Sequence, residues 1–270
     1  MTVEKERLDV LLVKKGYFSS REQARRSIMA GLVFVNRQRI DKAGTKVPMD
    51  AQIEVKGQLH PYVSRGGLKL EEALRLFAID VRDKVMLDIG ASTGGFTDCA
   101  LQHGVQLVYA IDVGYGQLAW KLRQDPRVIV MERTNFRYIK PEDLKEARPD
   151  FATIDVSFIS LAHILPPLKE LLLPEGQVVA LVKPQFEAGK EQVGKKGIVK
   201  DPAVHRQVLK RFVALAYEQG FDVQGIAPSP IQGGEGNIEF LSHMVYRAPR
   251  MLDWTQEIEK IVKEAHACFK

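Results

Sequence analysis

Four ionisable residues lie in apolar or small-residue surroundings, where charged side chains are rarely placed without a role. Lys69 begins an expected helix, Asp155 and Lys183 end two apolar runs, and Glu239 lies in an expected strand near the end of the chain. Because the carboxyl ends of neighbouring parallel strands meet at one edge of a sheet, Asp155 and Lys183 should lie side by side. Amines and carboxylates gathered in this way can transfer or hold a proton. The alternative is an ion pair that only ties two strand ends together.

A glycine-rich run stands at the end of an earlier apolar run, residues 85–90. It reads Asp88-Ile-Gly-Ala-Ser-Thr-Gly-Gly-Phe96. Glycine lets a backbone turn tightly between strand and helix and approach a ligand closely. The run lacks the Gly-Lys-Ser/Thr of phosphate loops and the glycine spacing of dinucleotide-binding loops. It resembles the S-adenosylmethionine (SAM) motif, in which the acid and the loop backbone hold the methionine part. The alternative is a turn that needs glycine only for steric reasons. The residues assigned to the cofactor from this run are Asp88, Gly90, Ser92, Gly94, Gly95 and Phe96.

Two further side chains extend the expected cofactor site. Asp112 ends the next apolar run, where a carboxylate can accept hydrogen bonds from both ribose hydroxyls of a nucleoside. Asn135 follows the third apolar run, residues 128–131, and is placed to bond the adenine edge. Many enzymes with the SAM motif carry an acid at this point. Both also have a simpler interpretation, because Asp and Asn often bond backbone amides in turns.

Apolar runs and helical stretches alternate from about residue 69 onward. The expected strands cover residues 85–90, 107–113, 128–131, 151–156, 178–183, 223–226 and 238–246, and the expected helices include 96–103, 117–123 and 253–269. Such alternation predicts a mostly parallel, doubly wound α/β sheet. The turn-rich segment 228–237 joins the last two strands without a helix, which predicts an antiparallel hairpin. Seven strands ending in a hairpin resemble the Rossmann-like SAM-dependent methyltransferase domain.

The first sixty residues read as a separate basic module. They hold 12 Lys/Arg and 7 Asp/Glu, whereas the other 210 residues hold 27 of each, so the whole net charge of +5 lies in this module. A basic module beside a neutral body is typical of polyanion binding, although a solvated lysine-rich surface would look the same. Two short helices precede short strands, which predicts a small α+β domain. On the second helix, Arg21, Arg25 and Arg26 form a basic ridge suited to phosphate contacts.

This module resembles the alpha-L RNA-binding domain of ribosomal protein S four and of several RNA enzymes. The resemblance rests on Arg-Leu-Asp at 7–9, Ser-Arg-Glu-Gln-Ala at 20–24, and Ile28, Gly31, Val33 and Val35-Asn36. It implies binding to structured RNA. We therefore expect an alpha-L domain over residues 1–60, a linker over 61–68 and a methyltransferase domain over 69–270.

The four ionisable residues resemble the Lys-Asp-Lys-Glu tetrad of FtsJ-type RNA ribose 2′-O-methyltransferases. With the strings around them and the alpha-L module in front, the chain resembles the TlyA family of haemolysin A-like rRNA methyltransferases over about residues 5–248. The resemblance implies SAM-dependent methylation of a ribose 2′-hydroxyl, at cytidine in rRNA of assembled small or large ribosomal subunits, without a metal. It implies Lys183 as general base or hydroxyl orienter, Asp155 and Glu239 as residues that position it, and Lys69 as a residue that tunes charge and contacts the target nucleotide.

Further basic residues are expected to contact RNA. Arg7 and Arg65 are candidates for backbone contacts that offset the cost of flipping a stacked target nucleotide out of its helix. Lys195 and Lys196 lie in the glycine- and lysine-rich segment 189–201, which we expect to become ordered on RNA. The alternative is a solvated loop.

Composition disfavours several other classes of protein. No run approaches the ~20 apolar residues that span a bilayer, and no signal segment begins the sequence. Two cysteines cannot build a disulfide framework or a Cys-rich zinc site, and the six histidines are scattered. We therefore expect a cytoplasmic protein without a metal and without stable membrane association. Three alternatives stay open: an RNA-binding protein with a decayed enzyme domain, another RNA-modifying enzyme such as a pseudouridine synthase, and a membrane-lytic protein.

Overall fold

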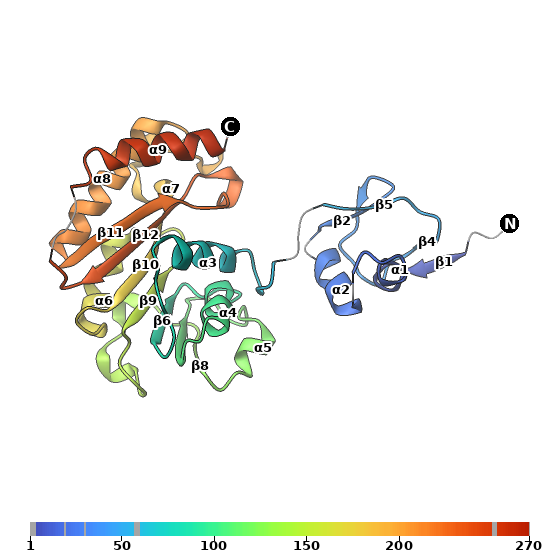
Figure 1. Ribbon diagram of the computed structural model, residues 1–270, viewed down its shortest axis with the longest axis horizontal. Helices are drawn as coiled ribbons and strands as arrows, with labels where there is room; N and C mark the ends of the chain where they lie inside the picture. Colours follow the sequence, from blue (N-terminus) through green and yellow to red (C-terminus); the bar gives the residue numbers. More distant parts are fainter. Residues whose placement is uncertain (1–3, 19, 30, 57–59, 250–252, 270) are drawn as a thin grey trace. The chain divides into compact units, whose positions relative to one another are not determined.

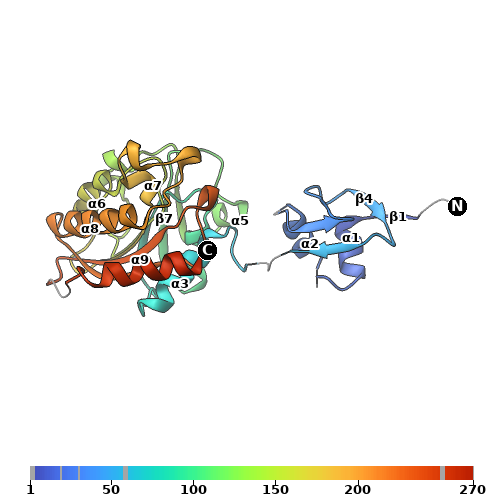
Figure 2. The ribbon, with the colours of Figure 1, turned by 90° about the horizontal axis from the view of Figure 1, so that it is seen from above.

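The computed structural model describes residues 4–18, 20–29, 31–56, 60–249 and 253–269. The chain forms two compact units, residues 1–61 and 62–270. Figure 1 draws the first unit in blue and the second in teal to red, and Figure 2 shows both from above. Each unit buries apolar clusters of its own, so each has a separate core.

The first unit packs two helices against short strands. Its elements are β1 (Lys5–Arg7), α1 (Leu8–Lys14), α2 (Arg21–Met29), β2 (Val33–Val35), β3 (Gln38–Arg39), β4 (Lys46–Pro48) and β5 (Ile53–Val55). Strands β3, β2 and β5 form one antiparallel sheet, and β1 pairs with β4. Leu8, Leu11 and Leu12 of α1 share a core with Ala24 and Ile28 of α2. The predicted α+β module is confirmed.

The second unit is built on one seven-stranded sheet. Its strands are β6 (Val85–Ile89), β7 (Leu107–Ile111), β8 (Val128–Met131), β9 (Phe151–Ile154), β10 (Gln177–Val182), β11 (Phe221–Pro228) and β12 (Phe240–Tyr246). Their order across the sheet is β11-β12-β10-β9-β6-β7-β8, and β12 runs antiparallel to both of its neighbours while the other pairs are parallel. The predicted Rossmann-like fold and its antiparallel final pair are confirmed.

Helices cover both faces of this sheet (Figure 1). On one face, α3 (Gly66–Leu76), α4 (Gly95–Gln102) and α5 (Trp120–Arg123) contribute to one apolar cluster. On the other, α6 (Leu165–Leu171), α8 (Pro202–Glu218) and α9 (Glu257–Cys268) contribute to a second cluster. Residues Val178–Val182 of β10 alternate between the two clusters, and β6 does the same apart from Asp88, so both strands are buried on both faces and are largely apolar.

The start of the second unit differs from the expected linker. Helix α3 begins at Gly66, so Lys69 lies inside its first turn rather than at its start. Tyr62 is buried in the same cluster as α3, and its hydroxyl donates to Glu71 at 2.7 Å. Val63 N donates to Asp98 of α4 at 2.8 Å. These contacts attach the segment before α3 to the second unit.

Several strand boundaries differ from the expected ones, and three of these differences involve residues of the tetrad. Strands β9 and β10 end one residue before Asp155 and Lys183, and β12 begins one residue after Glu239. Each of the three side chains therefore sits just beyond its strand, at the sheet edge. The sequence pattern alone placed them inside the strands because their neighbours are apolar.

Candidate active site

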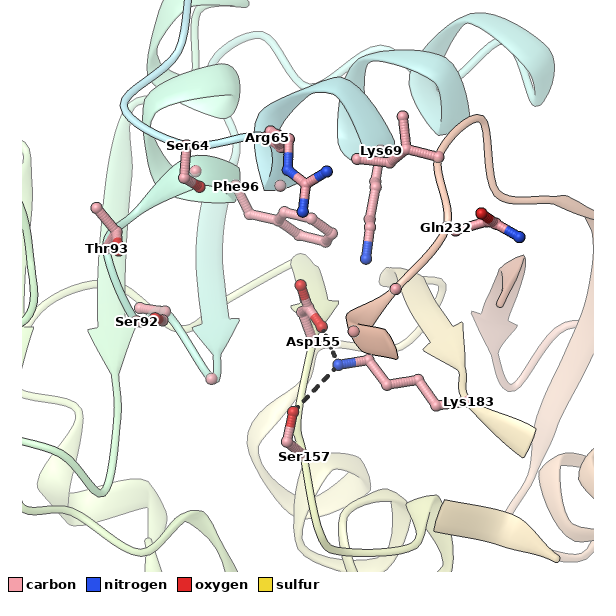
Figure 3. Close-up of a pocket in the computed structure, with 17 residues that line it drawn as sticks. Ser64, Arg65, Lys69, Ser92, Thr93, Phe96, Asp155, Ser157, Lys183 and Gln232 are labelled. Atoms are coloured by element: carbon pink, nitrogen blue, oxygen red, sulfur yellow. Dashed lines mark hydrogen bonds and ion pairs between the residues drawn. The ribbon is translucent and has the colours of Figure 1, made fainter. Parts of the chain in front are cut away.

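Two ion pairs lie close together at the carboxyl edge of the parallel strands. Lys183 Nζ lies 2.6 Å from Asp155 Oδ1 and donates to Ser157 Oγ at 3.3 Å (Figure 3). Lys69 Nζ donates to Glu239 Oε2 at 2.7 Å. In the close-up the Lys69 ammonium points into the space above the Asp155–Lys183 pair. Folding thus brings together residues that are up to 170 positions apart.

The local backbone explains the position of the Lys183 pair. Strands β9 and β10 are parallel neighbours, so the residues that follow them leave the sheet at the same edge. Pro184 has no N–H to donate, and it begins the single helical turn α7 (Pro184–Glu187) directly after Lys183. The Lys183 residue is only 8% exposed, so its ammonium depends on Asp155 and Ser157 for partners.

The pairing of Glu239 differs from the predicted one. The resemblance assigns Glu239 to Lys183, whereas in the structure it pairs with Lys69. The reason is that α3, which carries Lys69, packs against β12, and Glu239 immediately precedes that strand. Glu239 is 2% exposed and lies against Gly233, where a Cβ would overlap its Oε1 atom.

Sequence reasoning missed two polar residues of this cluster. Ser157 accepts from Lys183, and Gln185 Nε2 donates to Glu239 Oε1 at 3.2 Å. Each lies two positions after a tetrad residue, and that spacing is the only sequence signal that could have indicated them. Gln185 matters because it connects the segment after Lys183 to the second ion pair.

Two neighbouring cavities, which share lining residues and together form a groove, lie beside the Asp155–Lys183 pair. A cavity of about 340 Å³ is lined by the glycine-rich loop and by Arg65, Lys69, Asp155 and Lys183. A neighbouring cavity of about 460 Å³ is lined by Asp112, Asn135 and Phe158 among others. The residues that line both are Gly90, Ser92, Asp155 and Ser157. Both volumes fall in the range of about 300–1,000 Å³ typical of small-molecule sites.

Asp112 and Asn135 line the second cavity, as expected of cofactor-binding residues. Asp112 also accepts from Ser92 N at 2.8 Å and Gly114 N at 2.7 Å. Asn135 caps the short helix that follows it by accepting from Arg137 N at 3.2 Å. Each carboxylate oxygen has further lone pairs, so a role in shaping the loop is compatible with binding a ligand.

Asp88 does not line the groove, contrary to its expected contact with the cofactor. It is 0% exposed, and its carboxylate accepts from Thr97 N at 3.0 Å, Thr97 Oγ1 at 2.6 Å and Thr153 Oγ1 at 3.0 Å. Burial raises the pKa of Asp88 to about 6. Since Thr97 lies in the first turn of α4, Asp88 holds the start of the helix that follows the glycine-rich loop and does not itself face the groove.

Glycine is required at two points of this loop for different reasons. Gly90 has φ +88°, and a Cβ there would come within 2.5 Å of the Asp155 carbonyl oxygen. A Cβ on Gly95 would overlap Ser64 Oγ. The loop therefore packs directly on the segments that carry Asp155 and α3. Ser92, Gly95 and Phe96 line the first cavity, whereas Gly94 lies outside the linings of both cavities.

The predicted RNA-binding arginines of the first unit fall into two groups. Arg7 and Arg21 both bind the fully buried carboxylate of Asp9, at 3.0 Å each, and remain about half exposed. Hydrogen bonds from Arg7 and Arg21 hold the pKa of Asp9 down at about 2. Arg25 and Arg26 are exposed on α2, opposite its buried face. All four guanidinium groups are thus accessible on this unit.

The remaining predicted RNA contacts lie in the second unit. Arg65 lines the cavity with the tetrad, so it stands at the active site itself (Figure 3). Lys195 and Lys196 are exposed, but the segment around them is held by Asn237, which bonds Val199 N at 3.1 Å and the Gly197 carbonyl at 2.9 Å. Ordering of this segment by RNA stays a prediction.

Comparison with known proteins identifies the two units. Residues 62–246 match the FtsJ-like methyltransferase family and residues 6–53 match the S4 domain. The TlyA 16S/23S rRNA (cytidine-2′-O)-methyltransferase of Mycobacterium tuberculosis is 44% identical over 91% of this chain and 92% of its own length. The chain belongs to the TlyA family.

Two further relatives of this TlyA-family chain match over nearly its whole length. YqxC of Bacillus subtilis, named as a candidate rRNA methyltransferase, is 58% identical over 100% of this chain and 97% of its own. A solved structure titled as a candidate hemolysin from Streptococcus thermophilus is 54% identical, with a TM-score of 0.78 over 98% of this chain and 97% of that one. The TlyA-family chain is a SAM-dependent methyltransferase with an RNA-binding S4 domain.

The groove of this methyltransferase fits SAM. Gly90 and Ser92 of the glycine-rich loop line both cavities, Asp112 lines the larger one, and Lys69 and Lys183 line the smaller one. Within the described residues, no helix is long and apolar enough to cross a membrane. The same part of the chain holds no cluster of three His, Cys, Asp or Glu side chains arranged for a metal ion.

Proposed function

We propose that the protein transfers the methyl group of SAM to the ribose 2′-hydroxyl of a cytidine in rRNA. The observation that carries the proposal is the Lys183 ammonium, held by Asp155 and Ser157 on the floor of the groove beside the glycine-rich loop. The names of the TlyA relatives support both the ribose position and the base. Because the substrate is rRNA, we expect the protein in the cytoplasm.

We assign each part of the cofactor to residues that line the groove. Asp112 and Asn135 would hold the nucleoside in the larger cavity, and the backbone around Gly90 and Ser92 would hold the methionine part. When bound, SAM supplies an electrophilic methyl group on a sulfonium. The loop backbone can come this close to a ligand because Gly90 has no side chain.

Lys183 would act directly on the target hydroxyl. A ribose hydroxyl attacks poorly until its proton is removed or polarised, and its oxygen must face the methyl group. Lys183 Nζ can hold this oxygen as an ammonium, or take its proton as a neutral amine. Asp155 and Ser157 fix the direction of Nζ, so the hydroxyl would be positioned before reaction, which supplies much of the rate gain in such reactions.

Lys69 and Glu239 would serve the nucleotide rather than Lys183. Glu239 holds Lys69 Nζ inside the same cavity, where the ammonium can contact a phosphate or ribose oxygen of the target. Phe158, 91% exposed at the rim of the larger cavity, offers an apolar face against which an unstacked base can lie. The S4 domain would supply the remaining affinity through its exposed arginines.

The test is transfer of tritiated methyl groups from SAM to ribosomal subunits purified from a strain that lacks this gene. Wild-type protein should label rRNA, and the labelled linkage should resist alkaline cleavage because a 2′-O-methyl group blocks it. Lys183→Ala should lower transfer at least about 100-fold. The exposed Lys263→Ala of α9 is the matched control and should keep full activity.

Each other result points to a different function. SAM binding without transfer to either subunit would move the substrate to another RNA. Alkali-sensitive label would place the methyl group on a base. Absence of SAM binding would favour the second candidate, an RNA-binding protein with an inactive enzyme domain.

A further inference from the structure

The single turn α7, Pro184–Glu187, directly follows Lys183 of one ion pair and contacts Glu239 of the other. Its side chains reach in two directions. Gln185 bonds Glu239, and Glu187 bonds the segment that begins at Asp155. Neither Gln185 nor Glu187 lines the groove. Gln185 therefore contacts a tetrad residue and Glu187 contacts the segment after Asp155, and neither is placed to contact a substrate in the groove.

The Gln185 contact completes the surroundings of Glu239. One Glu239 oxygen accepts from Lys69 Nζ at 2.7 Å and the other accepts from Gln185 Nε2 at 3.2 Å. The carboxylate also fixes the orientation of the amide, because a flipped amide would set its oxygen against a carboxylate oxygen. As a consequence Gln185 Oε1 is buried without a hydrogen-bond partner among the described residues.

The Glu187 contacts hold the other side of the site. Its two carboxylate oxygens accept from Ser160 Oγ at 2.7 Å and from Leu161 N at 2.8 Å. Between these atoms and Asp155 lies the short segment that carries Ser157, and Phe158 packs on Phe186 of α7 with ring centroids 5.0 Å apart. Burial raises the pKa of Glu187, while its two hydrogen bonds favour the ionised form.

We infer that Gln185 and Glu187 are positioning residues. Through α7 they fix the position of one ion pair relative to the other. This inference rests on the proposed function. The mechanism needs Lys183 and Lys69 at fixed places around one nucleotide, and α7 contacts both Glu239, the partner of Lys69, and the segment that follows Asp155 and Ser157, the partners of Lys183. A displacement of about 1 Å at such a site costs up to about 100-fold in rate.

The decisive variant is Gln185→Glu, which keeps the shape of the side chain. When protonated, the new carboxyl can donate to Glu239 as the amide does. When ionised, it opposes Glu239, so methyl transfer should fall as pH rises, by roughly 10- to 100-fold relative to wild type. The other ionisable groups of the cluster are Lys69 on α3, Lys183 after β10 and Asp155 after β9, and all are unchanged. A merely structural role would lower activity equally at every pH.

Glu187 is tested by a pair of variants. Glu187→Ala removes both acceptors and should lower kcat about tenfold or more, with the KM for subunits and the Kd for SAM nearly unchanged. Glu187→Gln can still accept from Leu161 N and donate to Ser160 Oγ, so it should recover most of kcat. The control for the charge added in Gln185→Glu is Gln219→Glu, at a half-buried glutamine that follows α8.

All variants are assayed as the full chain on subunits from the deletion strain, beside wild type. An inactive wild type would overturn the proposed function itself, and with it the role of α7 that depends on it. An active wild type with a Gln185→Glu profile parallel to its own would overturn the inference, as would an unchanged kcat in Glu187→Ala. If Glu187→Ala does not fold, the pH profile of Gln185→Glu and the activity of Glu187→Gln decide.

Discussion

The Lys69–Glu239 ion pair should couple strongly in a double-mutant cycle. Its atoms are 2.7 Å apart and both side chains are almost fully buried. At an effective dielectric constant of 20 the attraction at this distance is about 6 kcal/mol, from which the cost of dehydrating both charges must be subtracted. Removing one partner leaves the other charge buried without compensation, so Lys69→Met or Glu239→Gln should each lower the free energy of unfolding by about 3 kcal/mol.

The double variant separates this reasoning from simple loss of packing. Once one charge is gone, loss of the second should cost little more, so the pair should cost about 3 kcal/mol rather than 6, a coupling of about 3 kcal/mol. Denaturant unfolding followed by tryptophan fluorescence reports on the correct unit, because both tryptophans, Trp120 and Trp254, lie in residues 62–270. Methyl transfer should be lost in all three variants.

A control pair lies at the opposite edge of the sheet. Lys84 and Asp150 are 3.1 Å apart and are more exposed, so their coupling should be below about 1 kcal/mol. Costs of Lys69→Met and Glu239→Gln that simply add would refute the reasoning, because they would mean that neither charge depends on the other.

Three further outcomes follow from the same geometry. The pKa of Asp88 is raised to about 6, so the folded protein binds a proton at Asp88 more tightly than the unfolded chain does. The free energy of unfolding should therefore fall by up to about 3 kcal/mol as pH rises from 4 to 6. Asp88→Asn should flatten this part of the curve of unfolding free energy against pH, measured by denaturant unfolding. Gly233→Ala should displace Glu239 and lower methyl transfer at least about tenfold, whereas Gly234→Ala, where a Cβ would meet no atom within 4 Å, should be much milder; equal losses would contradict the packing argument. Arg25→Gln should weaken binding of rRNA fragments regardless of their sequence and reduce the salt slope by about 1, and an unchanged slope would remove Arg25 from the RNA contact.

Most of the fold could be predicted from the sequence, because local pattern and global structure agree. Strands β6, β7, β9 and β10 are buried on both faces, so each leaves a largely apolar run, and helices separate the parallel strands. The small module was predictable for a similar reason, since Leu8, Leu11 and Leu12 mark one helix face. The boundaries at Gly66 and Phe240 differ from the predicted ones, because the flanking residues continue the same pattern.

In the candidate active site, the identity of the key residues could be predicted from the sequence, whereas most of their contacts depend on how the helices pack on the sheet. Lys69, Asp155, Lys183 and Glu239 stood out because a charged residue in an apolar stretch needs a partner, and that requirement is visible in one dimension. The sequence placed Asp155 beside Lys183, as the structure does, but it did not show that Glu239 pairs with Lys69, because that pairing depends on α3 packing against β12. The same holds for Asp88, whose motif suggests a ligand contact while its side chain bonds only Thr97 and Thr153. Residue type is carried by the chain, whereas the direction of a side chain is set by the elements that pack around it.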